Sequence, residues 1–378
     1  MTTNRRSPEA NPLVRLGEIG QSPWYDYITR DLVTTGELAR LIAEDGLRGM
    51  TSNPTIFEKA IAGSRLYDAE IRELAEAGRS AQQIFEHLAV SDVRAACDAF
   101  AGVHRETGGA DGLVSLEVSP ALAHDTEATI HEAERLWRSL DRPNAMIKIP
   151  GTREGLPAIT HCIAAGVSVN VTLLFSVQRY AEVIEAFLDG LERRVEAGLP
   201  IRPITSVASF FVSRVDGKVD PLLDGLGDPK GLRGRIAIAN ACTAYQLFEW
   251  SLGTPRWDRL AKAGARPQRP LWASTSTKDP RYSDVHYVEA LVAPRTVNTL
   301  PPETFAAYRD HGRPTVRIHE GEAAAPEQLR ALADLGIDLG AITRELEIDG
   351  VAKFAASYGA LLAGIETKAA MLAGAGRS

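Results

Sequence analysis

Cysteine is scarce in this chain. Its 378 residues include three cysteines, Cys97, Cys162 and Cys242, which lie far apart and form no Cys-x-x-Cys pair. Such a sparse, odd-numbered set argues against a disulfide framework and against a zinc site. Because disulfides persist in oxidising compartments and are rare in the cytosol, the composition fits a reducing environment. We therefore expect a cytoplasmic protein.

Long runs of one kind of residue are also missing. No block of Lys and Arg occurs and the formal net charge is -7, which argues against nucleic acid as a partner. No eighteen consecutive residues are apolar, and the segment from Met1 to Leu16 lacks the apolar centre of a secretory signal. We therefore expect no membrane span. A local pair of basic side chains could still bind the phosphate group of a small substrate.

Motifs for metals and nucleotide cofactors are absent. The eight histidines form no cluster with ligand spacing, and His131-Glu132 lacks the second histidine of a zinc-binding helix. Gly225-Leu226-Gly227 follows no strand-like run, so it does not qualify as a dinucleotide fingerprint. The sequence therefore implies neither a metal nor a cofactor.

Short apolar runs alternate with longer amphipathic segments along most of the chain. At 44% hydrophobic and 24% charged residues, the chain can bury a sizeable core. Eight strand–helix units predict a parallel (β/α)8 barrel. We expect an N-terminal arm at 1–20, then one barrel domain at 21–378 that ends in helices over Pro326–Leu372. The expected strands are Trp24–Ile28, Gly49–Ser52, Leu113–Val118, Ala145–Pro150, Val167–Leu174, Ile204–Phe210, Pro270–Ser276 and Val288–Val292, and the expected helices include Thr35–Asp45, Ala81–Val103, Thr126–Leu140, Val177–Ala197 and Gly234–Leu252.

Lys148 stands out because it is a cation inside an apolar, β-prone run, Ala-Met-Ile-Lys-Ile-Pro at 145–150. An ammonium in such surroundings loses hydration unless it is paired. A lysine that becomes neutral can attack a carbonyl and form a Schiff base. The alternative is a strand-end lysine whose amine reaches water. The residues at the other strand ends favour the reactive role.

Polar side chains stand at or just after the end of nearly every expected strand. In a barrel these ends meet at one mouth, where the reactive groups gather. Residues two apart on a strand face the same side, so Asn170 and Thr172 share a face opposite Val171. One such group could simply be satisfied by a neighbour, but the whole series predicts a site. Its members are Asp26, Asn53, Glu117, Lys148, Asn170, Thr172, Ser209 and Ser274.

These residue types suit the cleavage of a carbon–carbon bond through an imine. Imine formation requires proton transfers, for which Glu117 and Thr172 with a water are candidates. Bond cleavage requires a second base, for which Asp26 is the candidate. Asp26 could instead cap a helix or pair with Arg30.

Other polar groups near the strand ends suit a sugar phosphate. The amides of Asn53 and Asn170 could hold sugar hydroxyls. Arg214 and Lys278 both follow strands and could bind a phosphate, although each also fits a solvated surface charge.

Four motifs that occur in order resemble transaldolase. They are Thr-Ser-Asn-Pro-Thr at 51–55, Ile-Lys-Ile-Pro-Gly-Thr at 147–152, Asn-Val-Thr-Leu-Leu-Phe-Ser at 170–176 and Ala-Ser-Phe-Phe-Val-Ser-Arg-Val-Asp at 208–216. The overall length is similar to the longer bacterial branch of that family. The resemblance implies a barrel of the class I aldolase type. Such an enzyme moves a dihydroxyacetone unit from sedoheptulose 7-phosphate to glyceraldehyde 3-phosphate in the pentose phosphate pathway, giving erythrose 4-phosphate and fructose 6-phosphate.

The resemblance also implies roles for individual residues. Lys148 matches the Schiff-base lysine, Asp26 matches the acid/base aspartate, and Glu117 with Thr172 matches the pair that holds the catalytic water. No cofactor is implied, because the lysine supplies the electron sink. The implied substrate-binding residues are Asn53, Asn170, Ser209, Phe211, Arg214, Ser274 and Lys278.

One position departs from the shorter relatives. Where they carry a second phosphate-binding arginine, this chain has Ser276, and the nearest cation is Lys278. The second phosphate contact is therefore open between these two residues. Two other functions also remain open: a Schiff-base aldolase that releases free dihydroxyacetone, and a catalytically silent barrel that binds sugar phosphates. The oligomeric state is open between monomer and homodimer.

Overall fold

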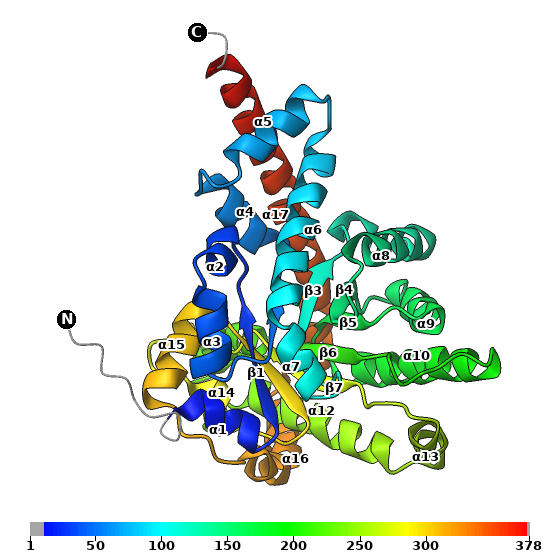
Figure 1. Ribbon diagram of the computed structural model, residues 1–378. Helices are drawn as coiled ribbons and strands as arrows, with labels where there is room; N and C mark the ends of the chain where they lie inside the picture. Colours follow the sequence, from blue (N-terminus) through cyan, green and yellow to red (C-terminus); the bar gives the residue numbers. More distant parts are fainter. Residues whose placement is uncertain (1–10, 376–378) are drawn as a thin grey trace.

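The expected barrel is present in a computed structural model, which describes residues 11–375. Eight parallel strands pair in chain order, and β8 pairs with β1 to close the ring. Helices surround this ring (Figure 1), as a (β/α)8 fold requires. The strands are β1 Gln21–Asp26, β2 Gly49–Thr51, β3 Leu113–Glu117, β4 Ala145–Pro150, β5 Val169–Leu174, β6 Ser206–Phe211, β7 Arg269–Ala273 and β8 Thr296–Leu300.

The helices follow the amphipathic segments closely. The expected helix at Thr126–Leu140 has these bounds in the structure, and the Asp125 side chain caps its first turn. The helix expected over Ala81–Val103 is instead divided at Phe100. The helices are α1 Pro12–Glu18, α2 Arg30–Thr34, α3 Glu37–Glu44, α4 Pro54–Ala62, α5 Asp68–Glu76, α6 Ala81–Ala99, α7 Ala101–Glu106, α8 Thr126–Leu140, α9 Gly155–Ala165, α10 Val177–Glu196, α11 Ser213–Gly225, α12 Ile236–Leu252, α13 Pro255–Lys262, α14 His286–Ala290, α15 Pro302–His311, α16 Ile318–Asp334 and α17 Leu339–Ala375, with a short 3-10 turn at Pro120–Leu122.

The eighth strand is not where the sequence predicted it. The run expected as a strand, Val288–Val292, overlaps α14, and β8 lies at Thr296–Leu300 instead. A short apolar run fits a buried helix as well as a strand. The true strand was obscured because its central residue is Asn298, which is fully buried and accepts a hydrogen bond from Thr275 at 2.9 Å.

The described part of the N-terminal segment is not the loose arm that we expected. Residues 1–10 lie outside the described residues. Residues 12–18 form α1, in which Leu13 and Leu16 are fully buried. The side chain of Asn11 accepts a hydrogen bond from the Leu13 amide at 3.0 Å and so caps this helix. This part of the arm is packed against the barrel.

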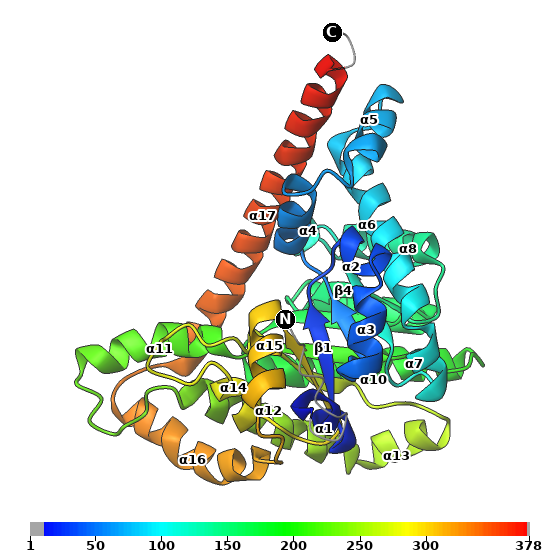
Figure 2. The same ribbon diagram turned by 60° about the vertical axis from the view of Figure 1, so that its left-hand side comes forward.

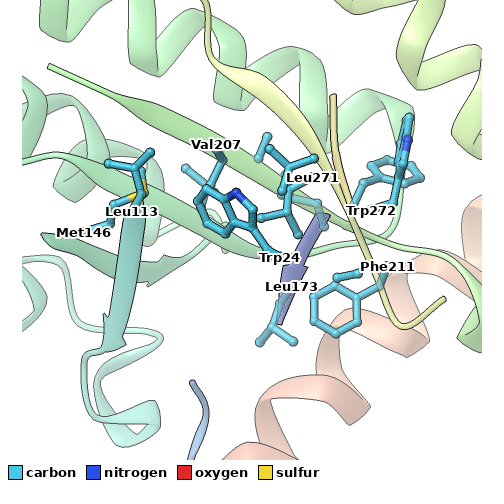
Figure 3. Close-up of a cluster of buried hydrophobic side chains, with 14 of the residues drawn as sticks. Trp24, Leu113, Met146, Leu173, Val207, Phe211, Leu271 and Trp272 are labelled. Carbon is cyan, nitrogen blue, oxygen red and sulfur yellow. The ribbon is translucent and has the colours of Figure 1, made fainter. Parts of the chain in front are cut away.

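The amino-terminal half of the barrel interior is a packed core. The Trp24 ring crosses the neighbouring strand at Gly49, where a Cβ atom would lie 2.4 Å from the ring. Glycine is therefore required there for the close approach. Beyond this filled half, a cavity opens at the carboxyl ends of the strands. Figure 3 shows Trp24 within a buried cluster that also includes Leu113, Met146, Leu173, Val207, Phe211, Leu271 and Trp272.

The long helix α17 passes the mouth of the barrel and projects beyond it beside α4 and α5 (Figures 1 and 2). Its segment Leu339–Ala373 is long and apolar enough to cross a membrane, judged by length and composition, with 28% of its most apolar window buried. A single helix of this kind is weak evidence for a span. The absence of a membrane span therefore stays a prediction.

Candidate active site

A cavity of about 1590 Å³ opens where the strands end. Most of the predicted site residues meet at its wall, although they come from six strands and the loops that follow them. Glu117 and Asn170 lie behind this wall. Within residues 11–375, no three His, Cys, Asp or Glu side chains gather as metal ligands would. The predicted residues that line the cavity are Asp26, Asn53, Lys148, Thr172, Ser209, Phe211, Arg214, Ser274, Ser276 and Lys278.

Lys148 and Glu117 form a buried pair at one side of the cavity. They are direct neighbours on β4 and β3. The Lys148 Nζ atom lies 3.2 Å from Glu117 Oε2 and donates to the Ser52 carbonyl at 3.0 Å. The two side chains are 6% and 7% exposed, so the alternative in which the amine reaches bulk water is wrong. Burial raises the pKa of Glu117, against the attraction of Lys148, and favours a carboxyl group that can accept the lysine proton.

Asp26 ends β1 and faces the same cavity. Its Oδ1 atom accepts a hydrogen bond from Thr51 Oγ1 at 2.7 Å, and Thr51 in turn lies 2.6 Å from Thr299 Oγ1. Burial raises the pKa of Asp26, while Lys148, Thr51 and Arg214 lower it. A carboxyl group held between opposing influences in this way is suited to acid–base work.

Arg30 is not the partner of Asp26, so that alternative is wrong. Arg30 Nε donates to Asp92 at 2.9 Å, and Arg30 also pairs with Glu70. The Tyr67 hydroxyl donates to the same Asp92 carboxylate at 2.8 Å. This network ties the start of α2 to α5 and α6, and it leaves Asp26 to the cavity.

Thr172 and Asn170 face the barrel interior as the period-two pattern predicted, but they differ in availability. The Thr172 hydroxyl is buried and has no hydrogen-bond partner among residues 11–375. The Asn170 amide already donates to Ser115 Oγ at 3.0 Å and accepts from Ser209 Oγ at 2.7 Å. Buried polar atoms rarely stay unpaired, so Thr172 is the one of the two that is ready for a water or substrate atom.

The cavity wall also includes Arg214, in the first turn of α11. Its guanidinium carbon lies 4.9 Å from the centre of the Phe211 ring. Burial lowers its pKa, with Asp26 acting in the opposite direction. Ser274 lies close by, 3.0 Å from Ser213 between the two Oγ atoms, and has a φ of 55°. Lys278 is exposed on the same rim. The arrangement gives an anion a half-buried cation and nearby hydroxyl groups.

Several residues at this site were not found from the sequence. Thr51 belongs to the motif at 51–55, so the sequence marked its position. Its hydrogen bond to Asp26 could not be predicted without the pairing of β1 with β2. Asp216 is also in a motif; burial raises its pKa to about 7, and it accepts from the Ala237 amide at 2.7 Å and from Tyr287 at 3.0 Å. Phe354 of α17 also lines the cavity, and no local signal in the sequence marks it.

Comparison with known proteins agrees with this geometry. A family model described as transaldolase/fructose-6-phosphate aldolase matches residues 23–365. A protein of Acidothermus cellulolyticus named transaldolase is 52% identical over 94% of this chain and 96% of its own length. Relatives named transaldolase in Frankia alni and transaldolase 2 in Nostoc are 50% and 46% identical over at least 93% of either chain. The chain therefore belongs to the transaldolase/fructose-6-phosphate aldolase family.

Proposed function

We propose that this protein is a transaldolase that carries a dihydroxyacetone unit on Lys148 from a ketose phosphate to an aldose phosphate. The observation that carries the proposal is the buried Lys148–Glu117 pair, with its 3.2 Å contact, beside a cavity large enough for a sugar phosphate. The substrates are sedoheptulose 7-phosphate and glyceraldehyde 3-phosphate, and the products are erythrose 4-phosphate and fructose 6-phosphate. We place this reaction in the cytoplasm, carried out by a monomer or homodimer.

Imine formation falls to Lys148, Glu117 and Thr172. Glu117 takes a proton from the ammonium, and the neutral amine attacks the C2 carbonyl carbon of the ketose. Loss of the C2 oxygen as water then gives a protonated imine. A water held between Glu117 and the unpaired Thr172 hydroxyl relays these protons. The iminium nitrogen is the electron sink, so the reaction requires no further cofactor.

Bond cleavage falls to Asp26. Its carboxylate takes the proton of the C4 hydroxyl, the C3–C4 bond breaks, and the electron pair moves into the imine to leave an enamine on Lys148. The aldose phosphate departs and an acceptor aldehyde takes its place. The enamine carbon attacks the new carbonyl carbon, Asp26 returns the proton to the new hydroxyl group, and hydrolysis frees the product ketose.

Substrate recognition falls to the remaining residues of the cavity wall. We assign the phosphate group to Arg214, with Ser274, Ser276 and Lys278 near it. Asn53 and Ser209 hold hydroxyl groups of the sugar, and Phe211 forms an apolar wall. Asn170 acts through Ser209, because its amide is engaged inside the barrel.

The proposal is tested by a coupled assay with both sugar phosphates, on the wild type and on Lys148→Met. The wild type should continue to release erythrose 4-phosphate beyond the first turnover only when an acceptor aldehyde is added, and the variant should be inactive. Borohydride with fructose 6-phosphate should attach a reduced three-carbon unit to the peptide that contains Lys148. Release of free dihydroxyacetone at the rate of transfer would indicate the aldolase instead, and an adduct on another lysine would refute the assignment of Lys148.

A further inference from the structure

The helix α17 is fixed on both sides of the cavity. On one side, Lys218 of α11 pairs with Glu345 and, at 3.1 Å, with Asp349. On the other side, Thr55 of α4 donates to Ser357 at 2.8 Å. Figure 2 shows the helix leaving α11 and passing α4. The stretch between these anchors therefore has a defined position at the mouth of the barrel.

Gly350 allows this stretch to approach the strand ends. A Cβ atom at Gly350 would lie 3.1 Å from Leu173 Cδ2 and 3.5 Å from Phe175 Cε2, which leaves little room for a side chain. One helical turn later the same face presents Phe354. That side chain is 7% exposed, so α17 places an aromatic ring directly at the cavity.

The Phe354 ring lies near two cations of the site, Lys148 and Arg214. Its centre is 5.9 Å from Lys148 Nζ and 6.0 Å from the guanidinium carbon of Arg214. Arg214 also lies 4.9 Å from the Phe211 ring of β6. The guanidinium therefore lies near two aromatic rings, one from β6 and one from α17.

The Arg214 guanidinium is positioned by its contacts with these two rings. Among residues 11–375, no group gives its guanidinium a hydrogen bond or an ion pair, and burial lowers its pKa. A ring face attracts a cation without occupying its N–H donors. The N–H edge therefore stays available for the paired oxygens of a phosphate. Lys148 depends less on the ring, because Glu117 and the Ser52 carbonyl already hold it.

We propose that Phe354 is a positioning residue for Arg214, so that the C-terminal helix helps to determine the preference for phosphorylated sugars. The inference rests on the proposed function, since the phosphate is that of the sugar substrate. Together with Phe211, the Phe354 ring restricts the rotamers of the long arginine side chain. The phosphate then binds a guanidinium that is already oriented, and less conformational freedom is lost on binding.

The test replaces the ring and measures the preference for phosphate. Phe354→Leu should lower kcat/KM for fructose 6-phosphate about fivefold, mainly through KM, given the usual strength of a cation–ring contact. Activity on fructose should stay within about twofold. Phe354→Tyr keeps the ring and should retain the wild-type ratio. Ile348→Ala, on the exposed face of the same helix, should change neither sugar.

Two measurements separate this role from a structural one. In an Arg214→Met background, Phe354→Leu should cause no further loss on fructose 6-phosphate. Titration of inorganic phosphate by calorimetry should show binding about fivefold weaker in Phe354→Leu than in the wild type, and this requires no turnover. A wild type that binds phosphate but does not transfer would refute the proposed function alone. Equal losses on both sugars, or additive losses with Arg214→Met, would overturn the role of Phe354.

Discussion

Two arginines lie at opposite ends of the barrel, and their guanidinium groups differ in their hydrogen-bond partners. Arg269, at the amino end, donates to Ser22 at 2.9 Å, to Asp111 at 2.8 Å and to the Ala110 carbonyl at 2.7 Å. Arg214, at the carboxyl end, lies against the faces of two aromatic rings and has no hydrogen-bond or ion-pair partner in the part of the chain that the structure describes. A guanidinium with its donors satisfied supports the fold, whereas one with free donors can receive a ligand. In barrels of this kind stability and function are commonly divided in this way between the two ends.

The largest effects on activity are expected for the two carboxylates at the carboxyl end of the barrel, Asp26 and Glu117. Asp26→Asn should reduce transfer by roughly 10²- to 10⁴-fold, because it removes the base for bond cleavage. It should still trap fructose 6-phosphate as an imine under borohydride. Glu117→Gln should instead slow the trapping itself, as followed by mass spectrometry of quenched samples. Equal trapping rates in Glu117→Gln and the wild type would remove Glu117 from imine formation.

At the amino end the expected loss is in stability. Asp111→Ala leaves Arg269 partly buried without its carboxylate and also removes the acceptor for Ser22. Breaking a buried pair in this way costs about 3 kcal/mol. Urea unfolding should show this as a lower midpoint with an unchanged slope. The kcat of the folded fraction should match the wild type, and a loss of kcat would show that the two ends are not independent.

Arg214→Met should lower activity without lowering stability, in contrast to Asp111→Ala. We expect a loss of roughly tenfold or more in kcat/KM for fructose 6-phosphate, since a hydrogen bond to a charged group contributes about 1.5–3 kcal/mol. Activity on unphosphorylated fructose should hardly change. The urea midpoint should not fall, because no ion pair is broken. A midpoint as low as that of Asp111→Ala would mean that Arg214 supports the fold.

The smallest effect is expected at Lys278, the weaker of the two cations that we assign to the phosphate. Its ammonium is exposed and offers no paired donors, so Lys278→Met should lower kcat/KM for fructose 6-phosphate only about twofold to threefold. Ser276→Ala is the matched variant at the neighbouring candidate position. Whichever variant alters the ratio between fructose 6-phosphate and fructose marks the second phosphate contact. No change in either variant would place that contact elsewhere on the rim.

The parts of the fold and the site that could be predicted from the sequence are those with a local signal. The alternation of strands and helices predicted the barrel. The polar residues at strand ends predicted that Lys148 and Asp26 would face one common cavity. The sequence around Lys148 indicated an apolar environment, but it could not show that Glu117 is the neighbour of Lys148 across β3 and β4. Strand pairing brings together residues that are distant in the chain, and no single-strand pattern reveals it.

Other features required packing information that a sequence pattern does not contain. Asn170 was correctly assigned to the interior face, but its engagement by Ser115 and Ser209 depends on two other strands. Phe354 looks like any apolar position of an amphipathic helix. Its place beside Arg214 follows from the path of α17 across the barrel, which is fixed by contacts such as that of Thr55 with Ser357.

This path has a consequence for the order of events during synthesis. Thr55 and Ser357 are separated by 302 residues, and a ribosome that adds roughly 5–20 residues per second requires about 15–60 s to make the chain between them. The segment after β2 that carries Asn53 and the start of α4 therefore emerges long before the helix that anchors it. Until then the nascent barrel has its lysine but not the wall that Phe354 provides. On the roles proposed above, the groups for imine formation are therefore synthesised before the residue that orients the phosphate-binding arginine.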